Sequence, residues 1–142
     1  MTERTLILIK PDAVKHNMVG QILGYFEHYG LKIVRIKGIG AASLPLLAEH
    51  YREHRDKDFY VPLLQFMRSG PMIAVVLEGK HAMHKARKII GSAQPSEAHW
   101  GTIRYDLGWV KLRHTCPKNL VHASDSPAAA IREMALWFPA DE

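Results

Sequence analysis

The order of the expected elements predicts an α+β fold in which helices pack on one sheet. Strand-like apolar segments at 5–9, 31–39 and 72–77 alternate with segments of helical period, and a short fourth strand is expected at 120–121. The resulting β-α-β-(α)-α-β-α-β-α order is compatible with a ferredoxin-like βαββαβ core that carries extra helices. Because no repeat or linker divides the chain, we expect residues 1–142 to form a single domain.

Two strands and a helix are expected before residue 40. The run TLILI at 5–9 predicts a buried strand, which Lys10-Pro11 ends. The apolar residues at 19, 22, 23 and 26 share one face of a helix at 19–29, and Gly30 ends that helix. Alternating apolar residues at 31–39 predict the second strand.

Caps and chain breaks delimit the middle elements. Ser43 is the expected N-cap of a short helix that runs to about Tyr51. A second short helix is expected at 59–67. The third strand, at 72–77, follows the break made by Gly70-Pro71.

The last third of the chain combines one helix, an irregular stretch and a capped C-terminal helix. A helix is expected at 80–90, ending before a glycine. The stretch 91–119 is expected to be irregular, because it mixes glycine, proline and polar residues. After the strand at 120–121, Ser126-Pro127 supplies an N-cap and a proline at the first position of a helix that runs to about residue 138.

The composition is that of a water-soluble domain, with 47% hydrophobic and 23% charged residues. No apolar run approaches the ~20 residues of a membrane span, and no signal segment begins the chain, so we expect a cytoplasmic protein without a membrane partner. The single Cys116 favours a reducing compartment. One cysteine and nine scattered histidines give no zinc-ligand spacing.

The chain carries a net charge of +5 and a pI near 9.4, which suits an anionic ligand. The basic residues never form a block. A small phosphate ester and a nucleic acid are both anionic, so the net charge alone does not decide which of the two this chain binds.

The clearest candidate for chemistry is the segment Asn119-Leu120-Val121-His122-Ala123-Ser124-Asp125-Ser126. A neutral imidazole is a good nucleophile and proton carrier, so His122 is a candidate phosphate carrier, and a polar residue of a helix-capping turn is the alternative. Glu133 lies roughly two turns into the last helix, where its carboxylate could reach back to His122. Such a carboxylate fixes one ring tautomer and leaves the other nitrogen free; an unrelated surface glutamate is the alternative.

Three cations and one aromatic residue are further candidates. Lys10 follows a buried strand, Arg87 shares a basic helix face, and Arg104 lies in the stretch expected to be irregular. The arginine fork suits phosphate because it donates two charge-assisted hydrogen bonds. Phe59 either stacks on a nucleobase or packs in the core. For the three cations, the alternative to a functional role is an ordinary solvent-exposed position.

Together these residues resemble the nucleoside diphosphate kinase family over essentially the whole chain. The most specific part is Asn119–Asp125, which matches the family's active-site signature Asn-x-x-His-[Gly/Ala]-Ser-Asp. Supporting matches stand in the family's order: Ile9-Lys10-Pro11-Asp12-Ala13, His50-Tyr51, Ser69-Gly70-Pro71, Glu78-Gly79 and Gly101-Thr102-Ile103-Arg104.

The resemblance implies a reaction and a role for each site residue. His122 would take the γ-phosphate of a nucleoside triphosphate such as ATP and pass it to a nucleoside diphosphate, with broad base tolerance. Glu133 would hydrogen-bond the second ring nitrogen with support from Ser124, and Tyr51 would lie beside the histidine. The implied nucleotide contacts are Lys10 and Asn119 at the ribose, Lys10, Arg87 and Arg104 at the phosphates, and Phe59 and Leu63 at the base.

The resemblance also implies a fold, a cofactor and an assembly. The fold would be a ferredoxin-like αβ sandwich with a four-stranded antiparallel sheet. Mg²⁺ would accompany the nucleotide without a dedicated protein site, with Asp125 as a candidate contact through water. The chain would form a tetramer or a hexamer. A non-catalytic nucleotide- or nucleic-acid-binding module on the same fold is the alternative hypothesis.

Three places depart from the family pattern. Ala93 stands where members usually carry a threonine that donates to a phosphate, and losing such a bond costs ~1.5–3 kcal/mol unless the neighbouring Ser92 replaces it. Asp56-Lys57-Asp58-Phe59-Tyr60 replaces the usual Arg-Pro-Phe-Phe and brings Asp58 to the expected nucleotide mouth. The stretch 104–119 is longer than usual, so the residue that faces Phe59 across the base is not identified from the sequence.

Overall fold

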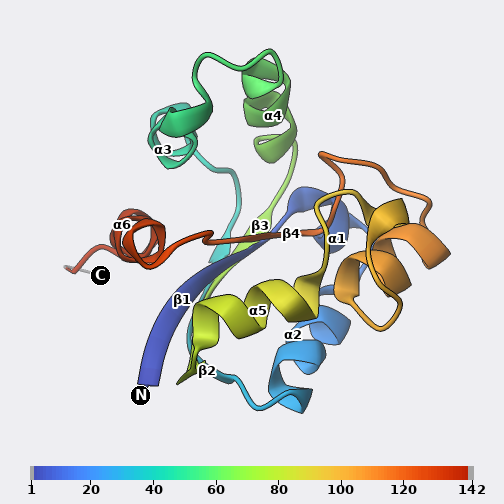
Figure 1. Cartoon of the computed structure of the whole chain (residues 1–142). Coiled ribbons are helices and arrows are strands. Elements are labelled where there is room, and N and C mark those ends of the chain that lie inside the picture. The colour runs from blue at the N-terminus through green and yellow to red at the C-terminus, as the bar shows by residue number, and fades with distance from the viewer. Residues whose placement is uncertain (1, 141–142) are drawn as a thin grey trace.

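A four-stranded antiparallel sheet forms the centre of the computed structural model, which describes residues 2–140 (Figure 1). Its strands, in the spatial order β2-β3-β1-β4, are β1 (Thr2–Ile9), β2 (Lys32–Ile39), β3 (Met72–Lys80) and β4 (Val121–Ala123). The strand β1 pairs with β3 over its whole length and with the short β4 at its end. The predicted sheet is therefore confirmed, with its antiparallel pairing.

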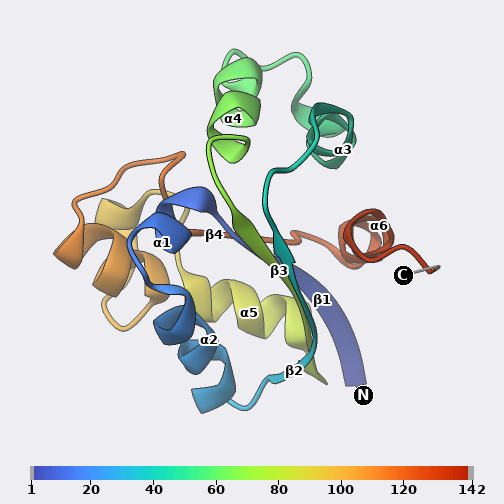
Figure 2. The ribbon, with the colours of Figure 1, turned by 180° about the vertical axis from the view of Figure 1, so that it is seen from behind.

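Helices cover both faces of this sheet, as the two views of Figures 1 and 2 show. They are α1 (Pro11–Lys15), α2 (Val19–His28), α3 (Leu44–His50), α4 (Tyr60–Met67), α5 (Ala82–Ile90) and α6 (Pro127–Trp137). Side chains alternate along a strand, so Ile7 and Ile9 of β1 enter the core under α2 and α5, whereas Leu6 and Leu8 enter the core under α3, α4 and α6. Within residues 2–140, no helix combines the length and the apolar composition needed to cross a membrane.

The boundaries near the site differ from the sequence prediction. Pro11 begins α1, although the sequence suggested only the end of a strand there; proline fits a first helical turn, where its missing N–H is not needed. The strand β3 extends to Lys80, so α5 begins two residues later than predicted. The strand β4 reaches Ala123, which places His122 in a strand rather than in a capping turn.

The stretch 91–119 was wrongly predicted to be irregular throughout. It contains the 3₁₀ turn η2 (Pro95–Glu97) and the π-helix η3 (Arg104–Lys111), and a similar 3₁₀ turn, η1 (Arg52–His54), follows α3. The hydroxyl of Tyr25 donates to Asp106 at 2.9 Å and ties η3 to α2. Arg104 is therefore the first residue of a helix. π-Helices are rare and have no simple hydrophobic period, which explains why the pattern missed this one.

Candidate active site

Pairing of β1 with β4 brings His122 close to Lys10. Leu8 of β1 stands opposite His122, and the backbone N–H of Lys10 donates to the carbonyl of Leu120 at 2.8 Å. The carboxylate of Asp12 accepts the N–H of Leu120 at 2.9 Å and secures the entry to β4. The sheet thus fixes both side chains on neighbouring strands.

The carboxylate of Glu133 orients the imidazole of His122. Oε1 of Glu133 lies 2.8 Å from Nε2 of His122 and accepts the hydroxyl of Ser124, also at 2.8 Å. Glu133 reaches this position because Ser126 caps α6, accepting the N–H of Ala129 at 3.0 Å. A carboxylate acceptor places the ring proton on Nε2 and leaves Nδ1 as the free nitrogen.

The environment of His122 keeps its ring uncharged. The side chain is 19% exposed. Burial, followed by the nearby positive charges of Lys10 and Arg104, lowers the pKa of His122 below its ordinary value of 6.5. The ring is therefore neutral at physiological pH, which is the form in which imidazole acts as a nucleophile.

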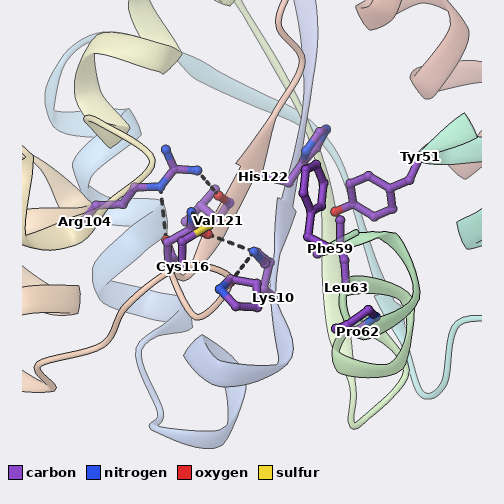
Figure 3. A pocket seen from close by; sticks show the side chains of 11 residues that line it. Lys10, Tyr51, Phe59, Pro62, Leu63, Arg104, Cys116, Val121 and His122 are labelled. Carbon is purple, nitrogen blue, oxygen red and sulfur yellow. Dashed lines mark hydrogen bonds between the residues drawn. The ribbon is translucent and has the colours of Figure 1, made fainter. Parts of the chain in front are cut away.

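Two cavities meet at His122. The first, of about 350 Å³, has apolar walls, with Phe59, Pro62 and Leu63 on one side and Cys116 on the other (Figure 3). Pro117 also lines this cavity. The second, of about 220 Å³, is polar. Its lining includes the residues Glu53, Arg87, Ala93, Arg104, Asp125 and Arg132.

Three residues, Tyr51, Arg104 and His122, line both cavities. A ligand in contact with the histidine would therefore extend an apolar part into the first cavity and an anionic part toward the second. Phe59 suits the apolar part, since this aromatic residue is 49% exposed.

Lys10 is a buried cation at the floor of the apolar cavity. Its side chain is almost fully covered, and Nζ donates to Oδ1 of Asn119 at 2.8 Å and to the carbonyl of Pro117 at 2.6 Å. Burial lowers the pKa of Lys10 to about 8, although Asp12 opposes this change. The third N–H of the ammonium group is left for a ligand.

The two predicted arginines come from different elements and converge on the polar cavity. Arg104 of η3 donates to the carbonyls of Gly91, Asn119 and Val121 at 2.9, 3.2 and 2.6 Å. Burial, followed by the charge of Arg87, lowers the pKa of Arg104 to about 10, so the side chain stays charged at neutral pH. Arg87 of α5 is exposed and reaches the carbonyl of Ala123 at 3.4 Å.

The departures from the family pattern lie at the edges of this site. Ala93 lines the polar cavity, and its carbonyl accepts Nδ2 of Asn119 at 2.8 Å. Ser92 and Asp58 are exposed and are not among the residues that line the two cavities. In this structure neither Ser92 nor Asp58 therefore reaches the space beside His122.

Sequence reasoning missed two residues that support the site. His50 is buried, accepts the indole N–H of Trp137 at 2.9 Å and packs its ring 4.4 Å from that of His122. Its position in His50-Tyr51, on the buried face of α3, was a usable signal. Arg132 donates to the carbonyl of Glu49 and to the carboxylate of Glu53, joining α6 to α3 and η1. No sequence pattern distinguished Arg132 from a surface residue.

His50, His122 and Glu133 also place one potential metal-ligand atom each within 4.8 Å of one another. In this structure the three side chains are engaged in the hydrogen bonds and ring contact just described. This group is therefore a network that holds the imidazole of His122. A neutral, oriented imidazole beside three cations is suited to accept a phosphoryl group.

Comparison with known proteins agrees with this geometry. The family model described as "Nucleoside diphosphate kinase" matches residues 3–142. A nucleoside diphosphate kinase of Staphylococcus saprophyticus is 49% identical over 99% of this chain and 90% of its own length. The Aquifex aeolicus nucleoside diphosphate kinase is 37% identical with a TM-score of 0.92, covering 100% of this chain and 99% of its own. The Halobacterium salinarum enzyme, solved in complex with CDP, is 38% identical with a TM-score of 0.91, covering 100% of this chain and 91% of its own.

Proposed function

The chain belongs to the nucleoside diphosphate kinase family, and we propose that His122 is the nucleophile of its phosphoryl transfer. The observation that carries this proposal is the orientation of the neutral imidazole. Its Nε2 is held by Glu133, and the ring lies where the apolar and polar cavities meet. The free Nδ1 is thereby available to a phosphate bound between the cations.

The reaction has two halves that reverse one another. Nδ1 of His122 attacks the γ-phosphorus of a nucleoside triphosphate such as ATP, the bond from that phosphorus to the bridging oxygen breaks, and a nucleoside diphosphate leaves. A second nucleoside diphosphate then attacks the phosphohistidine through its terminal oxygen, and the N–P bond breaks. Glu133 keeps the Nε2 proton in place throughout, so the same nitrogen is available in each cycle.

The nucleotide contacts follow from the two cavities. The base stacks on Phe59 beside Leu63, and stacking accepts every base, which supports broad base tolerance. Lys10 and Asn119, hydrogen-bonded to each other, hold the ribose hydroxyls, and Lys10 also reaches the phosphates. With the base and the ribose placed in this way, the charged triphosphate binds to residues of the polar cavity.

Charged and polar donors surround the transferred phosphate. Arg87 and Arg104 clamp the phosphates, and Arg104 uses three of its five N–H donors on the backbone, which leaves two for a ligand. Burial raises the pKa of the Tyr51 phenol, so its hydroxyl stays protonated and donates to the phosphate. Most of the catalysis in such transfer comes from positioning and charge stabilisation.

Mg²⁺ fits the oxygen donors of the polar cavity better than its nitrogen donors. The carboxylate of Asp125 lies in this cavity and is exposed, whereas that of Glu53 is engaged by Arg132 at 2.7 Å. Asp125 would therefore hold the ion through water. Bound there with the nucleotide, Mg²⁺ would supply positive charge that offsets the negative charge of the phosphates.

Further properties of the chain belong to the same proposal. The two cores share one sheet, which supports residues 1–142 as one domain. Ile36 on the edge strand β2 is 55% exposed and Trp100 is 75% exposed, which supports a tetramer or hexamer that covers them; light scattering measures this directly. A cytoplasmic location stays a prediction.

Labelling with ATP that carries ³²P in its γ-phosphate tests the proposed nucleophile. The parent is expected to form an acid-labile phosphoenzyme and to pass the label to GDP. The His122→Gln variant is expected to form none, while His84→Gln, which alters an exposed histidine of α5, is expected to match the parent. Phosphoenzyme on His122→Gln would refute the assignment. Salt-steep nucleic-acid binding without any turnover would favour the binding-module alternative.

A further inference from the structure

Cys116 lines the apolar cavity on the side opposite Phe59 (Figure 3). Cys116 is the only cysteine of the chain, and its side chain is exposed. Figure 3 shows it on the same side of the cavity as Arg104 and Lys10, across from Tyr51 and Phe59. The surrounding segment is fixed, since the N–H of Cys116 donates to Gln94 at 3.1 Å and the carbonyl of Pro117 accepts Nζ of Lys10 at 2.6 Å.

An independent observation shows that this cavity is built for a ligand. Tyr51 is only 7% exposed, yet its hydroxyl has no hydrogen-bond partner among residues 2–140 and points into the cavity in Figure 3. The Tyr51 hydroxyl is not among the buried unpaired polar atoms of residues 2–140, so it opens into the cavity that Tyr51 lines and is available to a bound molecule. The cations Lys10 and Arg104 in the same wall select for an anionic one.

We propose that Cys116 is a modification site for small anionic disulfides, and that the mixed disulfide formed there excludes the nucleotide. The inference rests on the proposed binding of nucleotide in this cavity. Glutathione disulfide represents the chemical class, since its carboxylates complement Lys10 and Arg104. The attached group would occupy the space between Cys116 and Phe59 that the base requires.

The chemistry is thiol–disulfide exchange. The Cys116 thiol loses its proton to solvent, its sulfur attacks one sulfur of the reagent, and the S–S bond of the reagent breaks as the new S–S bond forms. The second glutathione leaves as a thiolate with the bonding electron pair. The reagent is itself the oxidant, and an added thiol reverses the exchange.

Intact-mass measurement tests the site on the whole protein. Glutathione disulfide is expected to add one glutathione per chain, and ADP with Mg²⁺ at ten times its Kd is expected to slow this about tenfold, because only the free chain reacts. Cystamine, a cationic disulfide, is expected to react more slowly than glutathione disulfide. Adduct formation that ADP leaves unchanged, or faster reaction with cystamine, would overturn the proposal.

Calorimetry then measures the consequence for nucleotide binding. The adduct is expected to bind ADP at least about tenfold more weakly, with full recovery after dithiothreitol. A matched control combines Cys116→Ser with Thr115→Cys, which moves the thiol to an exposed neighbour outside the cavity lining. This control is expected to be modified without protection by ADP and without loss of ADP affinity.

The outcome separates this inference from the proposed function. Adduct formation and ADP affinity can also be measured on the His122→Ala variant. Neither measurement needs phosphoryl transfer, so both report on the thiol alone. An adduct that binds ADP as tightly as the untreated chain would overturn the inference and leave the phosphohistidine intact. A parent that binds ADP but forms no phosphoenzyme would overturn the nucleophile assignment and leave the thiol site standing.

Discussion

At the scale of single residues, one carboxylate oxygen of Glu133 serves two donors, because Nε2 of His122 and Oγ of Ser124 each lie 2.8 Å from it. Ser124 is fully buried and Glu133 nearly so, which holds that oxygen in one place. The imidazole is thereby fixed in rotation as well as in tautomer. Glu133 and Ser124 nevertheless differ in importance. Glu133 contacts the ring and sets its tautomer, whereas Ser124 contacts only Glu133.

Replacing Glu133 is therefore expected to cost much more than replacing Ser124. Glu133→Gln no longer enforces the Nε2 proton, and the rate of phosphoenzyme formation is expected to fall on the order of 10²-fold or more, as for other histidines that lose their orienting carboxylate. Ser124→Ala removes one hydrogen bond, worth about 1 kcal/mol, or roughly fivefold. Rapid-quench measurement with labelled ATP gives both rates. The reverse order of the two effects would contradict this account.

The pKa of Lys10 predicts how nucleotide binding changes in alkaline solution. Because burial lowers this pKa to about 8, the free chain loses the ammonium charge as the pH rises through that value. The ratio kcat/KM is expected to fall above about pH 8, whereas kcat changes less, because a bound phosphate favours the charged amine. Lys10→Arg is expected to abolish this inflection. An unchanged profile in that variant would assign the inflection to another group.

At the scale of elements, the site depends on where α5 ends. Gly91 terminates α5 with φ 97° and ψ −176°, a conformation that favours glycine, and its carbonyl accepts Nη1 of Arg104 at 2.9 Å. One residue thus ends a helix and positions Arg104, which we propose binds phosphate.

Gly91→Ala is expected to harm both stability and nucleotide affinity. A Cβ there would lie 2.6 Å from Oγ1 of Thr102, and the strained backbone itself costs about 1–3 kcal/mol. Urea unfolding measures the loss, and KM for ATP is expected to rise as Arg104 shifts. Gly24→Ala in α2 is the control: a Cβ at Gly24 meets no heavy atom within 4 Å, and the change is expected to stabilise by about 0.5–1 kcal/mol. Equal effects of the two substitutions would refute the role of Gly91.

Local signals predicted most elements, and they failed where structure depends on distant contacts. The side chains of Ser43 and Ser126 cap α3 and α6 as expected, since capping involves residues three apart. Pro11 was taken only as the end of β1, because proline both stops strands and starts helices. The position of Cys116 opposite Phe59 follows from the packing of a long segment, and no local pattern encodes it.

At the scale of the whole molecule, the buried histidines predict acid sensitivity. Burial lowers the pKa of both His50 and His122 below 6.5, so below about pH 6.5 the unfolded chain binds protons that the folded chain does not. Their contribution to stability is complete above pH 6.5 and declines as the pH falls, by up to about 1.4 kcal/mol per pH unit for each histidine.

Urea unfolding between pH 7 and pH 5 measures this decline. His122→Gln is expected to give a shallower dependence on pH than the parent. His84→Gln, which alters an exposed side chain, is expected to keep the slope of the parent. Identical slopes in all three proteins would show that His122 does not contribute.

The meeting of the two cavities at a single histidine has a kinetic consequence. In the proposed mechanism, donor and acceptor occupy the same space in succession. A diphosphate that binds before His122 is phosphorylated would therefore make a dead-end complex. The velocity is therefore expected to pass through a maximum as the diphosphate concentration rises at fixed ATP, and higher ATP should move this maximum to higher diphosphate. The balance of triphosphate to diphosphate around the enzyme would then set its working rate, without any separate regulatory site.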